Sequence, residues 1–518
     1  MSAIDVVHQP ARSTPPHAPD RARLWSWAWL LLGAAMLPFT FFQTVIPLAA
    51  WLAPVFLLRF ARTQRARVAL PVVALVGYGA TLIALRGFFA APDVLMWALA
   101  GVAMAVPYGA DALAAGRLHG LARTLLFPAV DTAMSFLFSL DQSSPLGSWG
   151  ATGYSQAANL PLLQVTSLVG VFGRSFLIMW AAPVVNELWE RRFDLRAARS
   201  VVLPFAAVLL AALLFGGVRL ALFPPSAPTV PMAALTPDRE LNAARDAADL
   251  ASGPRTAAER ERLTEQHLAP VLDDLFARTR RAARAGARVV AWSEAAGYVF
   301  KEDERAFLDE AATVARDEGI YLELGTVFIL PETGFPTNEN RSILIDPDGN
   351  IRWDYHKATM VPGDGNALGS GELPVVDTPF GRLSVVICFD ADFPWLVRQA
   401  GRAGVDVLLV PSSDWGPVGP VHADMAVVRA VENGVSILRP TRNGTSVAVD
   451  PHGRTLARAD DFTAGDQTMM AALPIEGEPA LYPLTGDAVG WALVIGVVLG
   501  TGALGWRALA RRRRSTLS

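Results

Sequence analysis

Glu294, Lys357 and Cys388 are three side chains whose types could together carry out nucleophilic acyl chemistry. A carboxylate can take the proton of a thiol, and the resulting thiolate can attack a carbonyl carbon. A nearby ammonium group can stabilise both the thiolate and the tetrahedral oxyanion, and the backbone N–H of Phe389, directly after the cysteine, is a natural second donor. The three side chains therefore predict covalent catalysis by a cysteine.

Each of these residues also has an ordinary explanation when it is taken alone. Cys388, the only cysteine, could be a small buried hydrophobe, and an acid after an apolar strand is commonly a surface residue or a helix cap. A lysine in a loop is usually solvated. The chain has only Lys301 and Lys357 beside 43 arginines, however. So strong a preference for arginine indicates that a retained lysine does something a guanidinium group cannot.

The stretch 385–394 predicts how the thiol is presented. A β-branched run ends at Cys388, and small and acidic residues then lead to Pro394 and an amphipathic segment. This order predicts a buried strand, a sharp turn and the start of a helix. A thiol at such a turn can face a cleft with free backbone N–H groups beside it.

The composition separates a membrane part from a soluble part. Residues 24–223 and 487–507 are strongly apolar, whereas 224–486 have the composition of a soluble α/β protein with 24 basic and 38 acidic residues. An acidic soluble part argues against binding of nucleic acid. A single cysteine excludes an intramolecular disulfide and a multi-cysteine metal site.

Apolar blocks of about 20 residues predict eight membrane spans. The block 24–60 is too long for one span and contains Pro38 and Pro47, which would let it turn back as two short spans. The other six spans are expected at 68–86, 93–113, 121–140, 161–186, 201–223 and 487–507.

The distribution of arginine predicts the orientation in the membrane. With the N-terminus inside, the basic clusters, including 59–67, 117–123, 191–199 and 511–514, all lie on the cytoplasmic side. Residues 1–23 would be a disordered cytoplasmic segment, 224–486 an extracytoplasmic domain, and 508–518 a basic cytoplasmic tail. The external loop 141–160 carries Trp149 and Tyr154, which suit a membrane interface.

The soluble block predicts alternating strands and helices. Strands are expected at 230–235, 289–294, 321–330, 342–346, 351–355, 384–388, 405–411, 436–439 and 446–449, and helices at 257–285, 304–317 and 421–433. Acids or nucleophiles at the carboxyl ends of such strands indicate a layered α/β sandwich with its site along one sheet edge.

The three candidate residues resemble the nitrilase, or carbon–nitrogen hydrolase, superfamily in their order and surroundings. The matching motifs are Trp292-Ser-Glu294, Tyr355-His-Lys357 with Val361-Pro362-Gly363, and Ile387-Cys388-Phe389-Asp390. The resemblance implies a Glu-Lys-Cys triad on an αββα sandwich, joined here to a multi-span α-helical membrane bundle of about seven helices and one closing span.

Within that superfamily, the membrane architecture resembles the apolipoprotein N-acyltransferase family over nearly the whole chain. The shared segments include 153–156, Ser413-Asp414-Trp415-Gly416, 419–422, 429–434, 439–444 and 482–487. The resemblance implies that Cys388 takes an acyl chain from phospholipid as a thioester and passes it to the amine of a diacylglyceryl-cysteine lipoprotein. It also implies a bacterial cytoplasmic (inner) membrane enzyme that is a monomer and needs no cofactor, with Trp415 near the substrate.

The sequence departs from that family where the substrates would be held. The family usually has Val-Pro-Phe-Gly-Glu after the lysine, whereas here Asp364 is a possible substitute for the glutamate and Glu372 a more distant one. Asp390 stands where the family has a glutamate two places past the cysteine, and the segment between Lys357 and Cys388 is shortened. The departures leave the triad intact and put the substrate in question.

Two other functions stay open from the sequence. One is a membrane-tethered amidase or nitrilase-like hydrolase, in which water replaces the acceptor amine. The other is a catalytically silent membrane scaffold that kept the fold, against which the intact triad argues. A lipid-sized apolar groove beside Cys388 would favour transfer, and a small closed pocket would favour hydrolysis.

Overall fold

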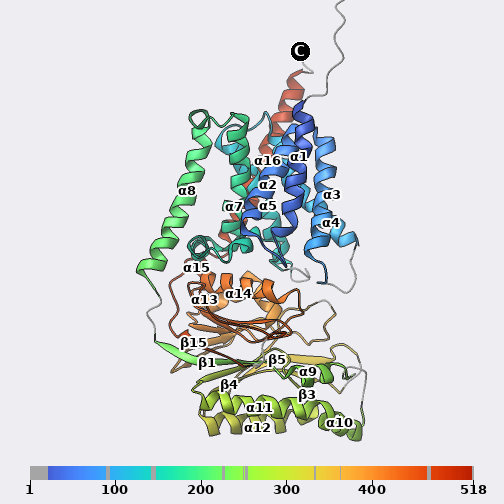
Figure 1. Ribbon diagram of the computed structural model, residues 1–518, viewed down its shortest axis with the longest axis vertical. Helices are drawn as coiled ribbons and strands as arrows, with labels where there is room; N and C mark the ends of the chain where they lie inside the picture. Colours follow the sequence, from blue (N-terminus) through green and yellow to red (C-terminus); the bar gives the residue numbers. More distant parts are fainter. Residues whose placement is uncertain are drawn as a thin grey trace, which may run out of the picture.

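The computed structural model describes residues 21–88, 94–141, 147–224, 228–248, 250, 255–331, 334–361, 363–463 and 468–515. Most of the predicted disordered N-terminus (1–20), Pro362 and the last three residues of the predicted tail lie outside these ranges. A helical bundle stands on one side of the molecule and an α/β domain on the other (Figure 1). The two parts are joined by the end of helix α8 and by the start of helix α16.

The helical bundle is the membrane part of a multi-pass protein. Its long helices are α1 (Arg21–Met36), α2 (Pro47–Thr63), α3 (Ala66–Ala84), α4 (Val94–Ala114), α5 (Leu121–Leu140), α7 (Thr166–Glu190), α8 (Leu195–Leu222) and α16 (Ala488–Ser515). Five of them, α3, α4, α5, α7 and α8, are long and apolar enough to cross a membrane, whereas α1 and α16 contain shorter apolar stretches. Large side chains such as Leu75, Leu95 and Leu214 are more than half exposed, which suits contact with lipid.

The helix expected over 161–186 is interrupted. A short α6 (Leu160–Leu163) precedes α7, and inside α7 Gly170 has φ 67° and ψ −178°. A Cβ atom at this glycine would lie 2.5 Å from the ring of Tyr482, which packs there from the chain segment entering α16. The break therefore needs glycine both for its backbone angles and for this close approach.

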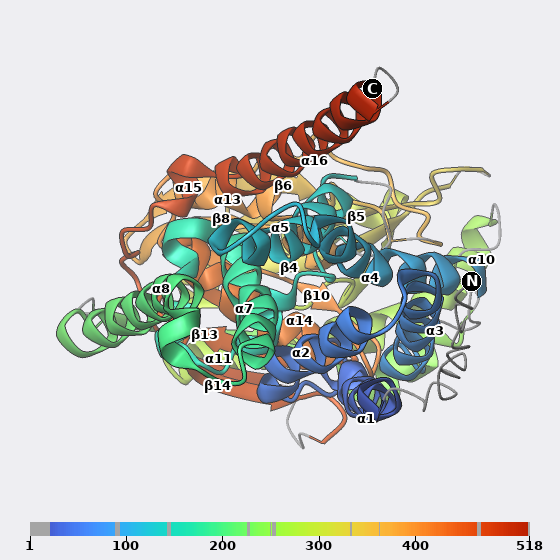
Figure 2. The same ribbon diagram turned by 90° about the horizontal axis from the view of Figure 1, so that it is seen from above.

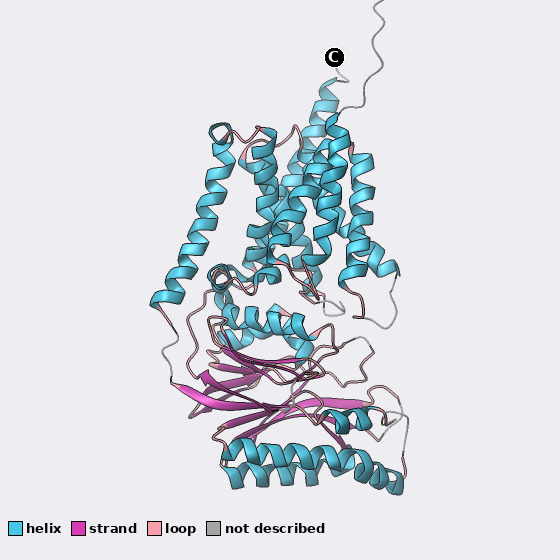
Figure 3. Cartoon of the chain, in the orientation of Figure 1, coloured by secondary structure: helices cyan, strands magenta, loops and turns pink. Residues whose placement is uncertain are grey.

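Two mixed sheets form the centre of the α/β domain (Figure 3). The first has the order β15-β1-β2-β4-β5-β6, with β3 beside β4, and its central pairs β1–β2 and β2–β4 are parallel. The strands are β1 (Thr229–Leu235), β2 (Val289–Trp292), β3 (Gly297–Phe300), β4 (Tyr321–Ile329), β5 (Asn338–Ile345), β6 (Ile351–His356) and β15 (Thr468–Pro474).

The second sheet has the order β14-β13-β11-β9-β8-β7, and its central pairs β11–β9 and β9–β8 are also parallel. Its strands are β7 (Val375–Thr378), β8 (Gly381–Val385), β9 (Val407–Leu409), β11 (Ser436–Arg439), β13 (Thr445–Val449) and β14 (Thr455–Asp460). A small pair, β10 (Ser412–Ser413) with β12 (Thr441–Arg442), lies apart from both sheets.

Helices cover the outer face of each sheet, so the domain has four layers (Figure 1). Helices α11 (Ala269–Arg284) and α12 (Glu304–Glu318) cover the first sheet, and α13 (Pro394–Arg402) and α14 (Gly419–Asn433) cover the second, on the side of the membrane helices. One apolar cluster fills the space around the second sheet and another the space between the first sheet and its helices. The predicted fold class, a helical membrane bundle with an αββα sandwich, is confirmed.

The structure differs from the predicted elements in two informative places. The helix expected over 257–285 is divided into α10 (Ala257–Leu263), a π-helical turn (Thr264–Leu268) and α11, and Pro270 stands where α11 begins. The strand expected to end at Cys388 ends at Val385, and the cysteine instead begins a 3₁₀ turn, η5 (Cys388–Asp392). The edge strands β7, β14 and β15 and the short helix α9 (Arg239–Asp246) had no clear sequence signal.

The membrane helices touch the α/β domain through α14. This helix contacts α7, the loop turn η2 (Thr152–Gln156) and the short α15 (Tyr482–Thr485). Seen from above, α7 and α14 overlap near the middle of the molecule, whereas α8 and α16 lie towards its edge (Figure 2). The second sheet and its turns therefore lie next to the membrane bundle.

Candidate active site

Cys388 lies at a sharp turn directly after the second sheet. Its N–H donates to the carbonyl of Pro411 (2.9 Å), and its Sγ atom lies 3.6 Å from the carbonyl oxygen of Ser413. Its φ is 47°, a left-handed value that is unfavourable for a residue with a side chain. Such a conformation persists only where the surroundings hold it, and it is common at functional sites.

Glu294 and Lys357 form a buried ion pair beside this turn. The Lys357 Nζ atom lies 2.8 Å from Oε1 of Glu294, and the side chains are only 3% and 4% exposed. Glu294 follows β2 and Lys357 follows β6, so the first sheet supplies both groups. The Glu294 carboxylate also accepts from Asn340 Nδ2 (2.7 Å) and from the Ser413 N–H (2.8 Å). Ser413 therefore touches both the carboxylate and the thiol.

Charge and burial act in opposite directions on the two reactive groups. Burial raises the pKa of the Cys388 thiol, the Glu294 carboxylate raises it further, and the Lys357 ammonium lowers it. Burial works to lower the pKa of Lys357, but the negative charges of Glu294, Cys388 and Asp364 outweigh it and raise that pKa. The lysine is therefore held as an ammonium group, which is the form that can stabilise a thiolate or an oxyanion.

Asp364 extends this pair. Its Oδ2 atom lies 3.4 Å from Lys357 Nζ and accepts from Asn366 Nδ2 (3.0 Å). Burial raises its pKa, and the Lys357 charge opposes this. Glu372, the other acid considered for this place, is exposed on the loop before β7. The structure thus brings Asp364, but not Glu372, to the lysine.

Asp390 braces the turn that carries Cys388. Its buried carboxylate accepts from the Tyr355 hydroxyl (2.9 Å), from the Thr359 hydroxyl and N–H (2.7 and 2.8 Å), and from the Ala358 and Ile387 N–H groups. These donors lie on both sides of Lys357 and just before Cys388. The carboxylate therefore holds the lysine loop against the cysteine turn.

Phe389, within the turn, and Trp415 both belong to the apolar core around the second sheet. The Phe389 ring is 3% exposed and packs edge-on against Phe393 and Trp149, with centroids 5.2 and 6.5 Å apart. Trp415 is half-buried, and its Nε1 atom has no hydrogen-bond partner among the described residues. Phe389 follows Cys388 directly in the chain and is the second residue of the turn η5.

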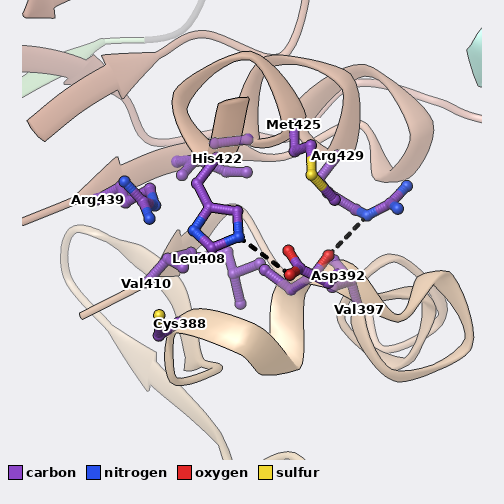
Figure 4. Close-up of a pocket in the computed structure, with 12 residues that line it drawn as sticks. Cys388, Asp392, Val397, Leu408, Val410, His422, Met425, Arg429 and Arg439 are labelled. Carbon is purple, nitrogen blue, oxygen red and sulfur yellow. Dashed lines mark hydrogen bonds and ion pairs between the residues drawn. The ribbon is translucent and has the colours of Figure 1, made fainter. Parts of the chain in front are cut away.

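A second buried charge cluster lies beside the cysteine (Figure 4). The His422 ring lies between Asp414 (2.8 Å from Nδ1) and Asp392 (3.1 Å from Nε2), and Arg439 Nη2 donates to both oxygens of Asp414. The Cys388 Sγ, an Asp414 oxygen and a His422 nitrogen lie within 4.8 Å of one another. The sequence alone predicted no role for this cluster. The features that could have indicated it are the position of Asp392 in the turn and that of His422 at the start of α14.

Trp149 belongs to the same cluster, although its residue type suits a membrane interface. It is only 5% exposed, and its Nε1–H donates to Asp392 Oδ2 (2.7 Å). The neighbouring Ser148 N–H donates to the carbonyl of Asp392 (3.1 Å). A hydrogen bond to a residue 243 positions away thus holds this tryptophan, in addition to any preference of its residue type for a membrane interface.

Cavities show where small molecules could lie. Beside Cys388 a space of about 10 Å³ is lined by His422, Met425 and Arg439 among others, which is room for about one water molecule. A larger cavity of about 220 Å³ lies among α2, α3, α4, α5 and α7, lined mostly by apolar side chains with Asp131 and Tyr108. A third, of about 20 Å³, shares Phe41 and Phe42 with the larger one and Met425 with the one beside Cys388.

Comparison with known proteins gives the class of this chain. Residues 247–478 match the family described as carbon-nitrogen hydrolase. Residues 247–478 thus form a carbon-nitrogen hydrolase, or nitrilase-like, domain, which this chain joins to a multi-pass membrane part. Apolipoprotein N-acyltransferases are its homologues over most of its length: that of Geobacter metallireducens is 27% identical over 401 residues, which cover 71% of this chain and 70% of the relative. That of Bradyrhizobium diazoefficiens is 28% identical and covers 68% of each chain.

Other relatives match a smaller share of the chain. The deaminated glutathione amidase of Mus musculus is 29% identical over 181 residues, or 30% of this chain and 55% of the relative. Among solved structures, an amidase from Nesterenkonia sp. is 22% identical, with a TM-score of 0.38, and covers 51% of this chain and 95% of that one.

Proposed function

We propose that this protein is a membrane N-acyltransferase that moves a fatty acyl chain from phospholipid, through a thioester on Cys388, to the amine of a diacylglyceryl-cysteine lipoprotein. The observation that carries the proposal is the buried Glu294–Lys357 pair beside a thiol whose turn is itself bonded to the membrane part. The homologues add support, since 68–71% of this chain matches apolipoprotein N-acyltransferases, and that is more than the α/β domain alone.

The first half-reaction loads the cysteine. Glu294 takes the thiol proton as the sulfur attacks the ester carbonyl of the phospholipid, and Lys357 with the Phe389 N–H stabilises the oxyanion. The carbon–oxygen bond then breaks, the proton passes to the departing alkoxide, and a lysophospholipid leaves. The product is an acyl thioester on Cys388.

The second half-reaction unloads it. The acceptor amine attacks the thioester carbonyl, Glu294 takes a proton from the amine nitrogen, and the same donors stabilise the second oxyanion. The carbon–sulfur bond breaks and the thiolate leaves, so that an amide forms; Glu294 then gives the proton to the thiolate, and the enzyme returns to its starting state. Catalysis by these residues consumes no cofactor.

The proposed arrangement in the cell follows from the charges of the chain. Residues 24–223 would form the membrane domain, 224–486 an extracytoplasmic catalytic domain and 487–507 the last span, with residues 1–23 and the basic tail 508–518 in the cytoplasm. The enzyme would work as a monomer in the bacterial inner membrane. The orientation rests on the basic clusters facing the cytoplasm.

A membrane-tethered amidase is the second candidate, and one observation favours it. The described space beside Cys388 holds about one water molecule, not an alkyl chain. In that reaction water would replace the acceptor amine and the substrate would be a small amide.

Intact-mass and peptide mass spectrometry separates the two candidates. The purified full chain is incubated with phosphatidylethanolamine and phosphatidylglycerol vesicles, and a fatty-acyl mass is expected on the Cys388 peptide. A diacylglyceryl-cysteine peptide should then remove that mass and become acylated itself. The variant Cys388→Ser should show neither event, and transfer at wild-type rate by this variant would disprove the mechanism. Release of ammonia from small amides without any acyl-cysteine would instead support the amidase.

A further inference from the structure

We infer that His422, as a buried imidazolium, is a positioning residue that couples the membrane loop carrying Trp149 to the thiol of Cys388. The inference rests on the proposed role of Cys388 as the nucleophile. It concerns no residue of the Glu-Lys-Cys triad, and it makes part of the membrane domain a component of the active site.

The protonation state of His422 follows from its two partners. Both ring nitrogens face carboxylate oxygens, Asp414 at 2.8 Å and Asp392 at 3.1 Å. A neutral imidazole has only one N–H, so one of these contacts would set a nitrogen lone pair against a carboxylate oxygen. Only the imidazolium satisfies both. Burial works to lower the pKa of His422, but the charges of Asp392 and Asp414 outweigh it and raise the pKa to about 9.

The positive charge of His422 balances the buried carboxylate of Asp392. Asp392 is 2% exposed, and among the described residues His422 is the only cationic group paired with it. Asp414, in contrast, has Arg439 as a second cation, which together with His422 lowers its pKa to about 2 against the effect of burial. Removing the imidazolium charge would leave the Asp392 carboxylate with the Trp149 donor and the more distant Arg439 but without a paired cation.

The same carboxylate is held from the membrane side. Trp149 donates to the oxygen that faces His422, its ring packs edge-on against the imidazole with centroids 5.2 Å apart, and Ser148 donates to the Asp392 carbonyl. A Cβ atom on Gly147 would lie 3.1 Å from the Asp392 Cβ, so the loop backbone itself is close. Figure 4 shows His422 directed from α14 towards Asp392, at the far end of the turn that begins with Cys388.

The thiol lies within reach of this charge balance. The Sγ of Cys388 is within 4.8 Å of a His422 nitrogen and an Asp414 oxygen. The charged groups that act on the thiol are Glu294, Lys357, Asp414 and Arg439. His422 itself faces Asp392 and Asp414. The other charged residues of its helix, α14, are Asp424, Arg429 and Glu432. At such a distance, loss of one positive charge disfavours the thiolate.

Alkylation of the single cysteine by iodoacetamide tests the inference on the full chain in detergent. In the wild type, the logarithm of the rate should rise with pH and flatten near pH 9, where His422 loses its proton. The variant His422→Gln should react about tenfold more slowly at pH 8, as a shift of about one unit in the thiol pKa requires, and should lack the flattening. Trp149→Phe should shift the profile in the same direction by less, because one donor to Asp392 is lost.

The opposite charge change supplies the decisive comparison. Asp392→Asn should speed alkylation, since it removes a negative charge and leaves the imidazolium, and the double variant H422Q/D392N should return to within about threefold of wild type. A purely structural role would make both single variants change in the same direction, and that result would overturn the inference. The double variant keeps the test valid if H422Q alone fails to fold.

The assay needs a matched control and does not depend on acyl transfer. His267→Gln makes the same chemical change in the π-helical turn between α10 and α11 and should leave the profile unchanged. The variants could shift the alkylation profile as expected while the wild-type protein forms no acyl-cysteine with phospholipid. That pair of results would refute the proposed function and leave the coupling intact. An unchanged profile in H422Q would refute the coupling whatever the substrate.

Discussion

Replacement of Lys357 by methionine tests how much stability a buried ion pair contributes, and a partly exposed lysine of the same chain provides the comparison. Lys357 is 3% exposed, and its ammonium lies 2.8 Å from the Glu294 carboxylate, which is 4% exposed. Methionine has a similar length but no charge, so Lys357→Met would leave Glu294 buried without a cation. Breaking such a pair from one side costs about 3–5 kcal/mol.

Lys301, the only other lysine, is the matched control. It pairs with Glu304 and Glu339 at 2.6 and 2.7 Å, but its side chain is 33% exposed. An exposed pair contributes about 0–1 kcal/mol, so Lys301→Met should cost several times less than Lys357→Met despite its shorter distances. Thermal unfolding of the α/β domain, followed by tryptophan fluorescence, measures both changes, at roughly 2–4 °C for each kcal/mol.

The double variant K357M/E294Q removes the stranded charge. It should recover most of the lost stability and none of the acylation of Cys388, because the general base and the ammonium are both gone. Equal destabilisation by the two lysine substitutions would refute the reasoning that burial decides the cost. So would a double variant less stable than K357M, because Glu294 would then not be the source of the penalty.

Two further substitutions test buried acids of the same domain. Burial raises the pKa of Glu323 to about 8, well above its unfolded value. The free energy of unfolding is therefore highest below about pH 4.5, where the carboxyl is neutral in both states, and it falls as the pH rises through 8. Glu323→Gln should therefore match the wild type at pH 4.5 in thermal unfolding and exceed it by a few kcal/mol at pH 8; a gain that does not depend on pH would contradict this. Asp390→Asn turns an NH₂ group towards donors of the loop 355–359 and the Ile387 N–H, which should cost about 1–3 kcal/mol for each donor left unpaired. It should also slow acylation of Cys388 with little change in donor KM, whereas unchanged stability would show that the carboxylate is no brace.

The sequence was sufficient to predict groups that lie at strand ends. Glu294 and Lys357 each follow a β-branched or aromatic strand, and strands of one sheet deliver their end residues to one edge. The distance between Lys357 and Glu294 could not be predicted, because it depends on the register of β5 between β4 and β6. Asn340, which donates to Glu294 from β5, has no local signal, since nothing in its neighbourhood distinguishes it from a solvated amide.

Contacts between the two parts of the chain were beyond sequence reasoning. Trp149 and Asp392 are 243 residues apart, and Glu432 accepts from the Val171 N–H across 261 residues (2.6 Å). The second bond depends on the helix break at Gly170, which frees that N–H from the helical ladder. A sequence pattern can predict an apolar span but not that a carboxylate from another domain will cap its second half.

Asp390 and Asp392 connect the turn of Cys388 to two different parts of the chain. Asp390 accepts from the loop 355–359 around Lys357, and Asp392 accepts from Trp149 of the membrane loop. Cys388, held at φ 47°, begins the turn that both anchors fix. A displacement of the membrane loop would therefore reach the thiol through Asp392, while the lysine stays held through Asp390. Alternate acids in one 3₁₀ turn thus connect both the membrane loop and the loop around Lys357 to the turn that carries the single thiol.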